Sequence, residues 1–150
     1  MRIWVDADAC PKPVREILYR AAERTRTELV LVAHQPLAVP RSAFVRMRTV
    51  VPGIDAADRA IVEAAEPGDL VVTADIPLAA AAVAKGATAI DPRGTLYTAE
   101  NVRQLLSLRD FMSELRGAGV DTGGHAAFGA RERQAFAGQL DRLLARMQGA

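Results

Sequence analysis

Aspartates at the ends of predicted buried strands are the residues of this chain whose type and spacing could do chemistry. Four of them follow short apolar runs directly or within a few residues, and a fifth lies in the first turn of a predicted helix. They are Asp6, Asp8, Asp75, Asp91 and, in the helix, Asp58. Since the carboxyl ends of parallel strands meet at one edge of a sheet, we expect these side chains to lie close together.

Several carboxylates in one place call for a positive partner. Neighbouring anions raise one another's pKa and repel unless a cation neutralises them. Mg²⁺ or Mn²⁺ is the natural partner for a group of oxygen ligands, and such an ion can activate water and stabilise an in-line phosphoryl displacement. The aspartates therefore predict a Mg²⁺ or Mn²⁺ site.

The same residues also have structural interpretations, which stay open at this point. Helix N-capping would account for Asp8, Asp55, Asp58 and Asp75. Asp91 precedes Pro92 in a predicted turn, where it could serve the turn alone. Asp6 is hardest to explain in this way, because it ends an apolar strand with no cation nearby in sequence.

Through residues 1–97, short apolar runs alternate with segments in which apolar residues recur at helical spacing. The runs 2–6, 29–33, about 49–51, 69–73 and 87–90 predict buried strands, and apolar residues at helical spacing separate most of them. This alternation predicts an α/β fold with about five mostly parallel strands and helices on both faces, joined by right-handed crossovers. Residues 98–150 predict a two-helix extension of the same single domain, with a glycine-rich loop at 117–129 between the helices.

Composition narrows the class of protein. The chain has 150 residues with 19 basic and 18 acidic side chains, so it is nearly neutral and does not bind nucleic acid by bulk charge. One cysteine and two histidines exclude disulfide frameworks and zinc sites built from those residues. The start MRIWVDAD has no apolar signal core, and no run is long enough to span a membrane. We expect a cytoplasmic protein that does not bind membranes.

Four motifs resemble the YaiI/YqxD family of bacterial proteins, which are viewed as relatives of PIN-like nucleases. They are WVDADACP at 4–11, VVTADIPLA at 71–79, DPRG at 91–94 and FGARERQAFAGQLD at 128–141. The resemblance implies a PIN-like parallel-sheet fold in which acidic residues bind Mg²⁺ or Mn²⁺ and hydrolyse phosphodiesters, with RNA as the partner rather than DNA. It implies Asp6, Asp58 and Asp75 as catalytic metal ligands, with Asp55 as the alternative to Asp58. Asp8 and Asp91 would be auxiliary ligands or groups that orient water.

Substrate contacts are expected beside these ligands. Thr73 is the polar neighbour of Asp75, and Arg93 could hold a substrate phosphate, as could Arg131 and Arg133 if the tail folds over the site. For each arginine a solvated surface position is the simpler interpretation. The segment 123–125 could cradle a phosphate through backbone N–H groups, although a flexible connector is the simpler interpretation here too. The oligomeric state is left open.

Two other functions fit the same residues. VDAD also looks like the DxD opening of haloacid-dehalogenase-type phosphatases, in which the first Asp is a nucleophile, but no convincing later Asp pair follows and Lys85 is poorly placed. A non-catalytic module that binds RNA or a protein is the second alternative.

Cys10 lacks a histidine close in sequence to act as its base, which favours a buried or incidental thiol.

Overall fold

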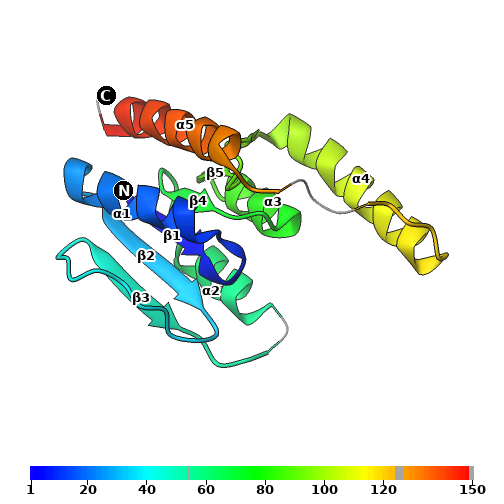
Figure 1. Ribbon diagram of the computed structural model, residues 1–150, viewed down its shortest axis with the longest axis horizontal. Helices are drawn as coiled ribbons and strands as arrows, with labels where there is room; N and C mark the ends of the chain where they lie inside the picture. The colour runs from blue at the N-terminus through cyan, green and yellow to red at the C-terminus, as the bar shows by residue number, and fades with distance from the viewer. Residues whose placement is uncertain (54, 124–126, 149–150) are drawn as a thin grey trace.

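A six-stranded sheet runs through the molecule in the order β3-β2-β1-β4-β5-β6 (Figure 1). The computed structural model describes residues 1–53, 55–123 and 127–148. Its strands are β1 (Arg2–Asp6), β2 (Glu28–Ala33), β3 (Val45–Thr49), β4 (Leu70–Val72), β5 (Thr88–Ile90) and β6 (Leu96–Tyr97). All neighbouring pairs are parallel except β5 and β6, which are antiparallel.

Helices cover both faces of this sheet. The helices are α1 (Lys12–Thr25), α2 (Ala56–Ala64), α3 (Ile76–Ala84), α4 (Ala99–Gly117) and α5 (Ala130–Gln148), and a 3₁₀ turn, η1 (Ala7–Ala9), follows β1. Alternate residues of β1 point to opposite faces: Ile3 and Val5 pack with α1 and α5, whereas Trp4 packs with α2, α3 and α4. Two apolar cores therefore flank one sheet, as the α/β pattern of the sequence predicted.

Details at the edges of the sheet differ from the sequence prediction. β3 ends at Thr49 instead of beginning there, and β6 is an additional strand. Of the five residues of β3 only Val45 is buried, so this edge strand lacks the apolar signature by which strands are found. β6 has two residues, too few for any period to show.

The chain order places a crevice at the carboxyl ends of β1 and β4. From β1 the chain moves outward through β2 to β3, then returns to β4 on the other side of β1 and continues outward to β6. In doubly wound sheets the space above such a reversal is where ligands bind, because the loops on its two sides diverge. Asp6 ends β1, and Thr73 follows β4 directly.

The long helix α4 extends away from the body of the molecule (Figure 1). Its first turn is fixed by a capping box between Thr98 and Asn101, and Val102 packs into the core. Farther along, Leu108 and Phe111 are exposed. Among the described residues, no helix is both long and apolar enough to cross a membrane.

Candidate active site at the switch point

Thr73 connects the two strands that flank the crevice. Its hydroxyl donates to Oδ2 of Asp6 over 3.0 Å and accepts from the backbone N–H of Asp75 over 2.9 Å. Thr73 and Asp6 are both buried, with 1% and 8% of their surface exposed. The hydroxyl therefore fixes the carboxylate at the end of β1 relative to the loop that follows β4.

Asp75 and Asp58 form a pair on the next loop and helix. Asp75 caps α3, because its Oδ1 accepts from the backbone N–H of Leu78 over 2.9 Å. Asp58, in the first turn of α2, lies close enough to Asp75 for the two carboxyl groups to raise the pKa of Asp58 through their charge and a side-chain hydrogen bond. Two carboxyl groups can share a hydrogen bond only when one of them carries a proton. Asp58 and Asp75 can therefore share a hydrogen bond when Asp58 is protonated.

The environment favours protonation of this cluster. Burial, followed by the charges of Asp75 and Asp6, raises the pKa of Asp58 to about 7, and the hydrogen bond to Asp75 acts in the same direction. Burial also raises the pKa of Asp6; the hydrogen bond from Thr73 opposes this, and the charge of Asp75 adds to it. At neutral pH the cluster thus carries less negative charge than its three carboxyl groups would carry in water.

The two remaining predicted ligands are held by different groups. Asp8 accepts from the backbone N–H of His34 at 3.1 Å and lies 3.8 Å from Nε2 of that imidazole. Asp91 accepts from the backbone N–H of Arg93 at 2.5 Å and lies 3.5 Å from the hydroxyl of Tyr97, which donates to the backbone carbonyl of Thr73 at 3.2 Å. These contacts direct Asp8 towards the end of β2 and Asp91 towards the turn after β5.

The predicted Mg²⁺ or Mn²⁺ site is therefore wrong. Within residues 1–53, 55–123 and 127–148, no three or more His, Cys, Asp or Glu side chains are arranged so that they could hold a metal ion. The proposed ligands were Asp6, Asp8, Asp58, Asp75 and Asp91. The physical reason is that Asp6, Asp8, Asp75 and Asp91 accept hydrogen bonds from separate protein donors, and so do not turn their oxygens towards one point. The sequence pattern predicted the sheet edge at which these aspartates lie, but not the protein groups that donate hydrogen bonds to them.

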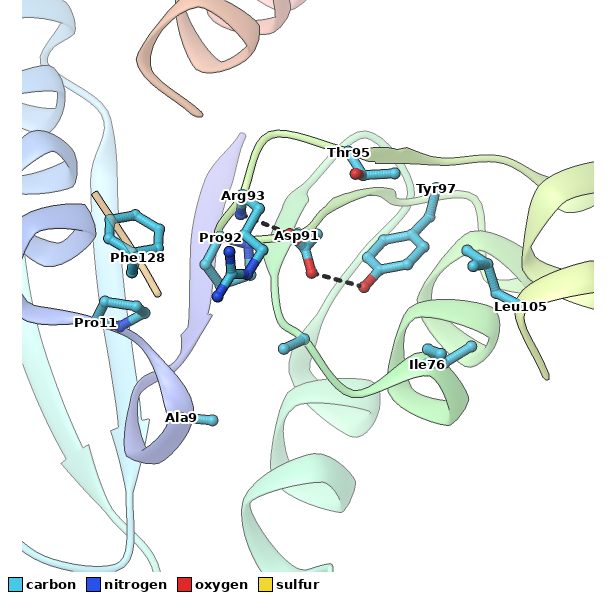
Figure 2. A pocket seen from close by; sticks show the side chains of 11 residues that line it. Ala9, Pro11, Ile76, Asp91, Pro92, Arg93, Thr95, Tyr97, Leu105 and Phe128 are labelled. Carbon is cyan, nitrogen blue, oxygen red and sulfur yellow. Dashed lines mark hydrogen bonds between the residues drawn. The ribbon is translucent and has the colours of Figure 1, made fainter. Parts of the chain in front are cut away.

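A pocket of about 340 Å³ lies beside the cluster (Figure 2). It is bounded by η1, the loop after β4, the turn 91–95, β6, α4 and the segment before α5. Its lining residues are Ala9, Pro11, Ala74, Ile76, Asp91, Pro92, Arg93, Thr95, Tyr97, Leu105 and Phe128. Since Ala74 lies between Thr73 and Asp75 in the chain, the pocket and the carboxyl cluster share one loop.

Arg93 occupies the middle of this pocket. In Figure 2 its side chain lies between Phe128 on one side and Asp91 with Tyr97 on the other. The guanidinium carbon is 5.7 Å from the centroid of the Phe128 ring, and Nη1 is 3.7 Å from a carboxylate oxygen of Glu132. Of the three arginines predicted to contact substrate, Arg93 is thus the one that lines this pocket.

The other predicted phosphate contacts lie elsewhere. Arg133 lines a separate hollow between α1 and α5, with Glu16 and Arg20, and Arg131 is exposed at the start of α5. Gly124 and His125 of the glycine-rich loop lie outside the described residues. Cys10 is buried, as expected, and burial raises the pKa of its thiol to about 12.

Three residues of the site were not assigned roles from the sequence. His34 follows β2, so the strand-end argument applied to Asp6 and Asp75 would have included it. Tyr97 lies in a strand too short to recognise, and burial followed by the charge of Asp91 raises the pKa of its hydroxyl. Phe128 reaches the pocket only through the fold of the tail, which no local pattern reports.

The fold and the site define a doubly wound α/β protein with an acidic site at its switch point. A family model described as "Uncharacterized BCR, YaiI/YqxD family" matches residues 4–146, and the chain belongs to this family, which confirms the resemblance found in the motifs.

Similar curated proteins, each named UPF0178 protein, cover nearly the same length. The relative from Alkalilimnicola ehrlichii is 62% identical over 144 residues, which are 96% of this chain and 97% of the relative. The relative from Hahella chejuensis is 58% identical over 146 residues, 97% of each chain. The relative from Cronobacter sakazakii is 58% identical over 144 residues, 96% of this chain and 95% of the relative. No solved structure is a significant match. None of these descriptions names an activity.

Proposed function

We propose that the protein cleaves phosphodiester bonds in RNA by acid–base catalysis, with Asp58 and Asp75 as the reacting carboxyl groups. The observation that supports this most strongly is the proximity of the two carboxyl groups at the switch-point crevice, where burial and the charge of Asp75 raise the pKa of Asp58, beside a pocket lined by Arg93. A hydrogen-bonded pair of carboxyls offers one group that can give a proton and one that can take a proton.

The ribose 2′-hydroxyl is the nucleophile that best fits such a pair. Asp75, as the carboxylate, takes the proton from the 2′-oxygen, which attacks phosphorus and forms the new O–P bond. Asp58, as the acid, gives its proton to the departing 5′-oxygen as the P–O bond breaks. The products are a 2′,3′-cyclic phosphate and a free 5′-hydroxyl. Transfer of the proton from Asp75 to Asp58 along their hydrogen bond restores the starting state.

The neighbouring residues fit supporting roles. Asp6 and Thr73 fix the loop that carries Asp75, since Thr73 binds both the Asp6 carboxylate and the backbone N–H of Asp75. Arg93 supplies positive charge to a phosphate that approaches an acidic edge. The requirement for a neighbouring 2′-hydroxyl makes RNA the substrate and excludes DNA from this reaction.

The test is cleavage of a single-stranded RNA by the wild type and three variants in buffer containing EDTA. Asp58→Asn and Asp75→Asn each remove one proton-transfer group, and we expect each to lower the rate on the order of 10²–10⁴-fold. Asn at position 75 still caps α3, so the loss would not come from helix fraying. Asp110→Asn, on exposed α4, is the matched control and should retain the wild-type rate.

Other outcomes are equally informative. Cleavage that is unchanged in both Asn variants would place the chemistry elsewhere or assign it to a contaminant. Hydrolysis of a phosphomonoester in place of RNA would favour the phosphatase interpretation of Asp6. RNA binding with no cleavage by the wild type would favour the non-catalytic module.

A further inference from the structure

We propose that the pocket between the turn 91–95 and Phe128 is a binding site for one nucleotide of a single-stranded RNA, with the base stacked on the Arg93 guanidinium and its phosphate bound by the same side chain. This inference rests on the proposed function, because it names how that substrate would be held. It assigns a role to the C-terminal extension, which contributes Leu105 and Phe128 to the pocket.

The lining of the pocket suits a flat, uncharged ring. Its walls are largely apolar: in Figure 2 Tyr97, Ile76 and Leu105 lie on one side of Arg93, and Phe128 lies on the other. Its volume of about 340 Å³ falls in the range of pockets that enclose small ligands, about 300–1,000 Å³. A bare phosphate would leave most of this apolar surface in contact with water, so a ligand with a ring is the better fit.

The polar groups lie in the middle of the pocket, where the ring and a phosphate would meet. Arg93 lies over the Phe128 ring at 5.7 Å, and its position is also fixed by Glu132 and by the turn that Asp91 closes. A guanidinium plane supported in this way can stack on a base, and its N–H groups can donate to phosphate oxygens at the same time. Stacking of this kind tolerates every base.

The position of the pocket connects it to the proposed chemistry. Ala74 lines it and immediately precedes Asp75, while Ala9 lines it from η1, which follows Asp6 directly. A strand whose base occupies the pocket therefore passes its sugar–phosphate backbone along the carboxyl edge. Phe128, just before α5, completes the pocket from a part of the chain distant from the turn 91–95.

The experiment measures binding alone, so that it does not depend on cleavage. A fluorescein-labelled 2′-O-methyl RNA hexamer, which lacks the free 2′-hydroxyl, is titrated with the full-length protein and followed by fluorescence anisotropy. We expect Arg93→Gln and Phe128→Ala each to weaken binding on the order of tenfold. Phe128→Leu keeps the apolar packing and removes the ring, so it should also weaken binding while circular dichroism reports a folded protein.

Matched controls come from the same chain. Phe111→Ala removes an exposed aromatic ring from α4, and Arg109→Gln removes an exposed arginine from the same helix; both should bind like the wild type. Adenosine monophosphate should compete with the hexamer, and inorganic phosphate at the same concentration should not.

Several results would overturn the inference. Wild-type affinity in folded Phe128→Leu and Arg93→Gln would move the binding site elsewhere. Competition by inorganic phosphate as strong as by adenosine monophosphate would reduce the pocket to an anion site. Binding of the free nucleotide but not of the hexamer would reject RNA as its source. Binding as expected without any cleavage of ordinary RNA would leave the nucleotide site intact and overturn the acid–base function alone.

Discussion

Replacing Asp58 by Asn should change how the stability of the protein depends on pH. The wild-type carboxyl has a pKa of about 7 in the folded protein, against 3.8 for an ordinary aspartate. Between these values the folded protein binds more protons than the unfolded chain, so its stability falls as the pH rises. An Asn side chain cannot ionise, and its amide can still donate to Asp75.

The size of the effect follows from the pKa difference. One pKa unit corresponds to about 1.4 kcal/mol, so an undiminished shift from 3.8 to about 7 would amount to about 4 kcal/mol. Asp58 is only half-buried, and solvent screening reduces that figure; we expect about 1–2 kcal/mol. At pH 8 the Asp58→Asn variant should be more stable than the wild type by this amount, and at pH 4 the two should be nearly equal.

Urea unfolding followed by circular dichroism at several values between pH 4 and pH 8 measures this difference. Asp110→Asn is the control, because Asp110 is 70% exposed on α4 and its replacement should give the same small change at every pH. A stability difference between Asp58→Asn and the wild type that does not grow with pH would refute the reasoning. So would a variant that is less stable than the wild type at pH 8.

Two further substitutions test how the site is held. Thr73→Val removes the hydroxyl that binds Asp6, and leaving that buried carboxylate without its donor should cost about 1–3 kcal/mol in urea unfolding, whereas Thr73→Ser should stay close to the wild type. A Thr73→Val protein as stable as Thr73→Ser would show that the hydroxyl bond is dispensable. Gly94→Ala should destabilise by at least about 1 kcal/mol, because Gly94 has φ +96° and a Cβ there would lie 2.7 Å from the backbone of Ala135 in α5. Gly117→Ala, with open space around it, is the matched control, and equal Tm values for the two variants would contradict the close approach of the turn to α5.

The sequence predicted the sheet and the edge that carries the site because both follow from local patterns. The alternation of apolar runs with segments of helical spacing predicts a doubly wound sheet. In such a sheet the carboxyl ends of β1 and β4 lie at the same edge. Asp6 and Asp75 could be placed at this edge from the residue pattern alone. The N-capping interpretation of Asp75, left open from the sequence, is confirmed.

What the sequence could not supply is the direction of each side chain. The carboxylate of Asp8 turns to the backbone N–H of His34 and that of Asp91 to the backbone N–H of Arg93, through hydrogen bonds in segments that are distant or irregular. Those partners explain why a row of aspartates at one edge did not become a metal site. Phe128 reached the pocket through packing of the tail, which depends on the whole fold.

The central claim is tested most directly by a DNA strand that contains a single ribonucleotide, incubated with the protein in EDTA. The account predicts one cut, immediately 3′ of the ribonucleotide, that leaves a 2′,3′-cyclic phosphate and a 5′-hydroxyl, and no cut in the Asp75→Asn variant. Cleavage at deoxyribonucleotides, products ending in a 5′-phosphate and a 3′-hydroxyl, or an intact strand would contradict it.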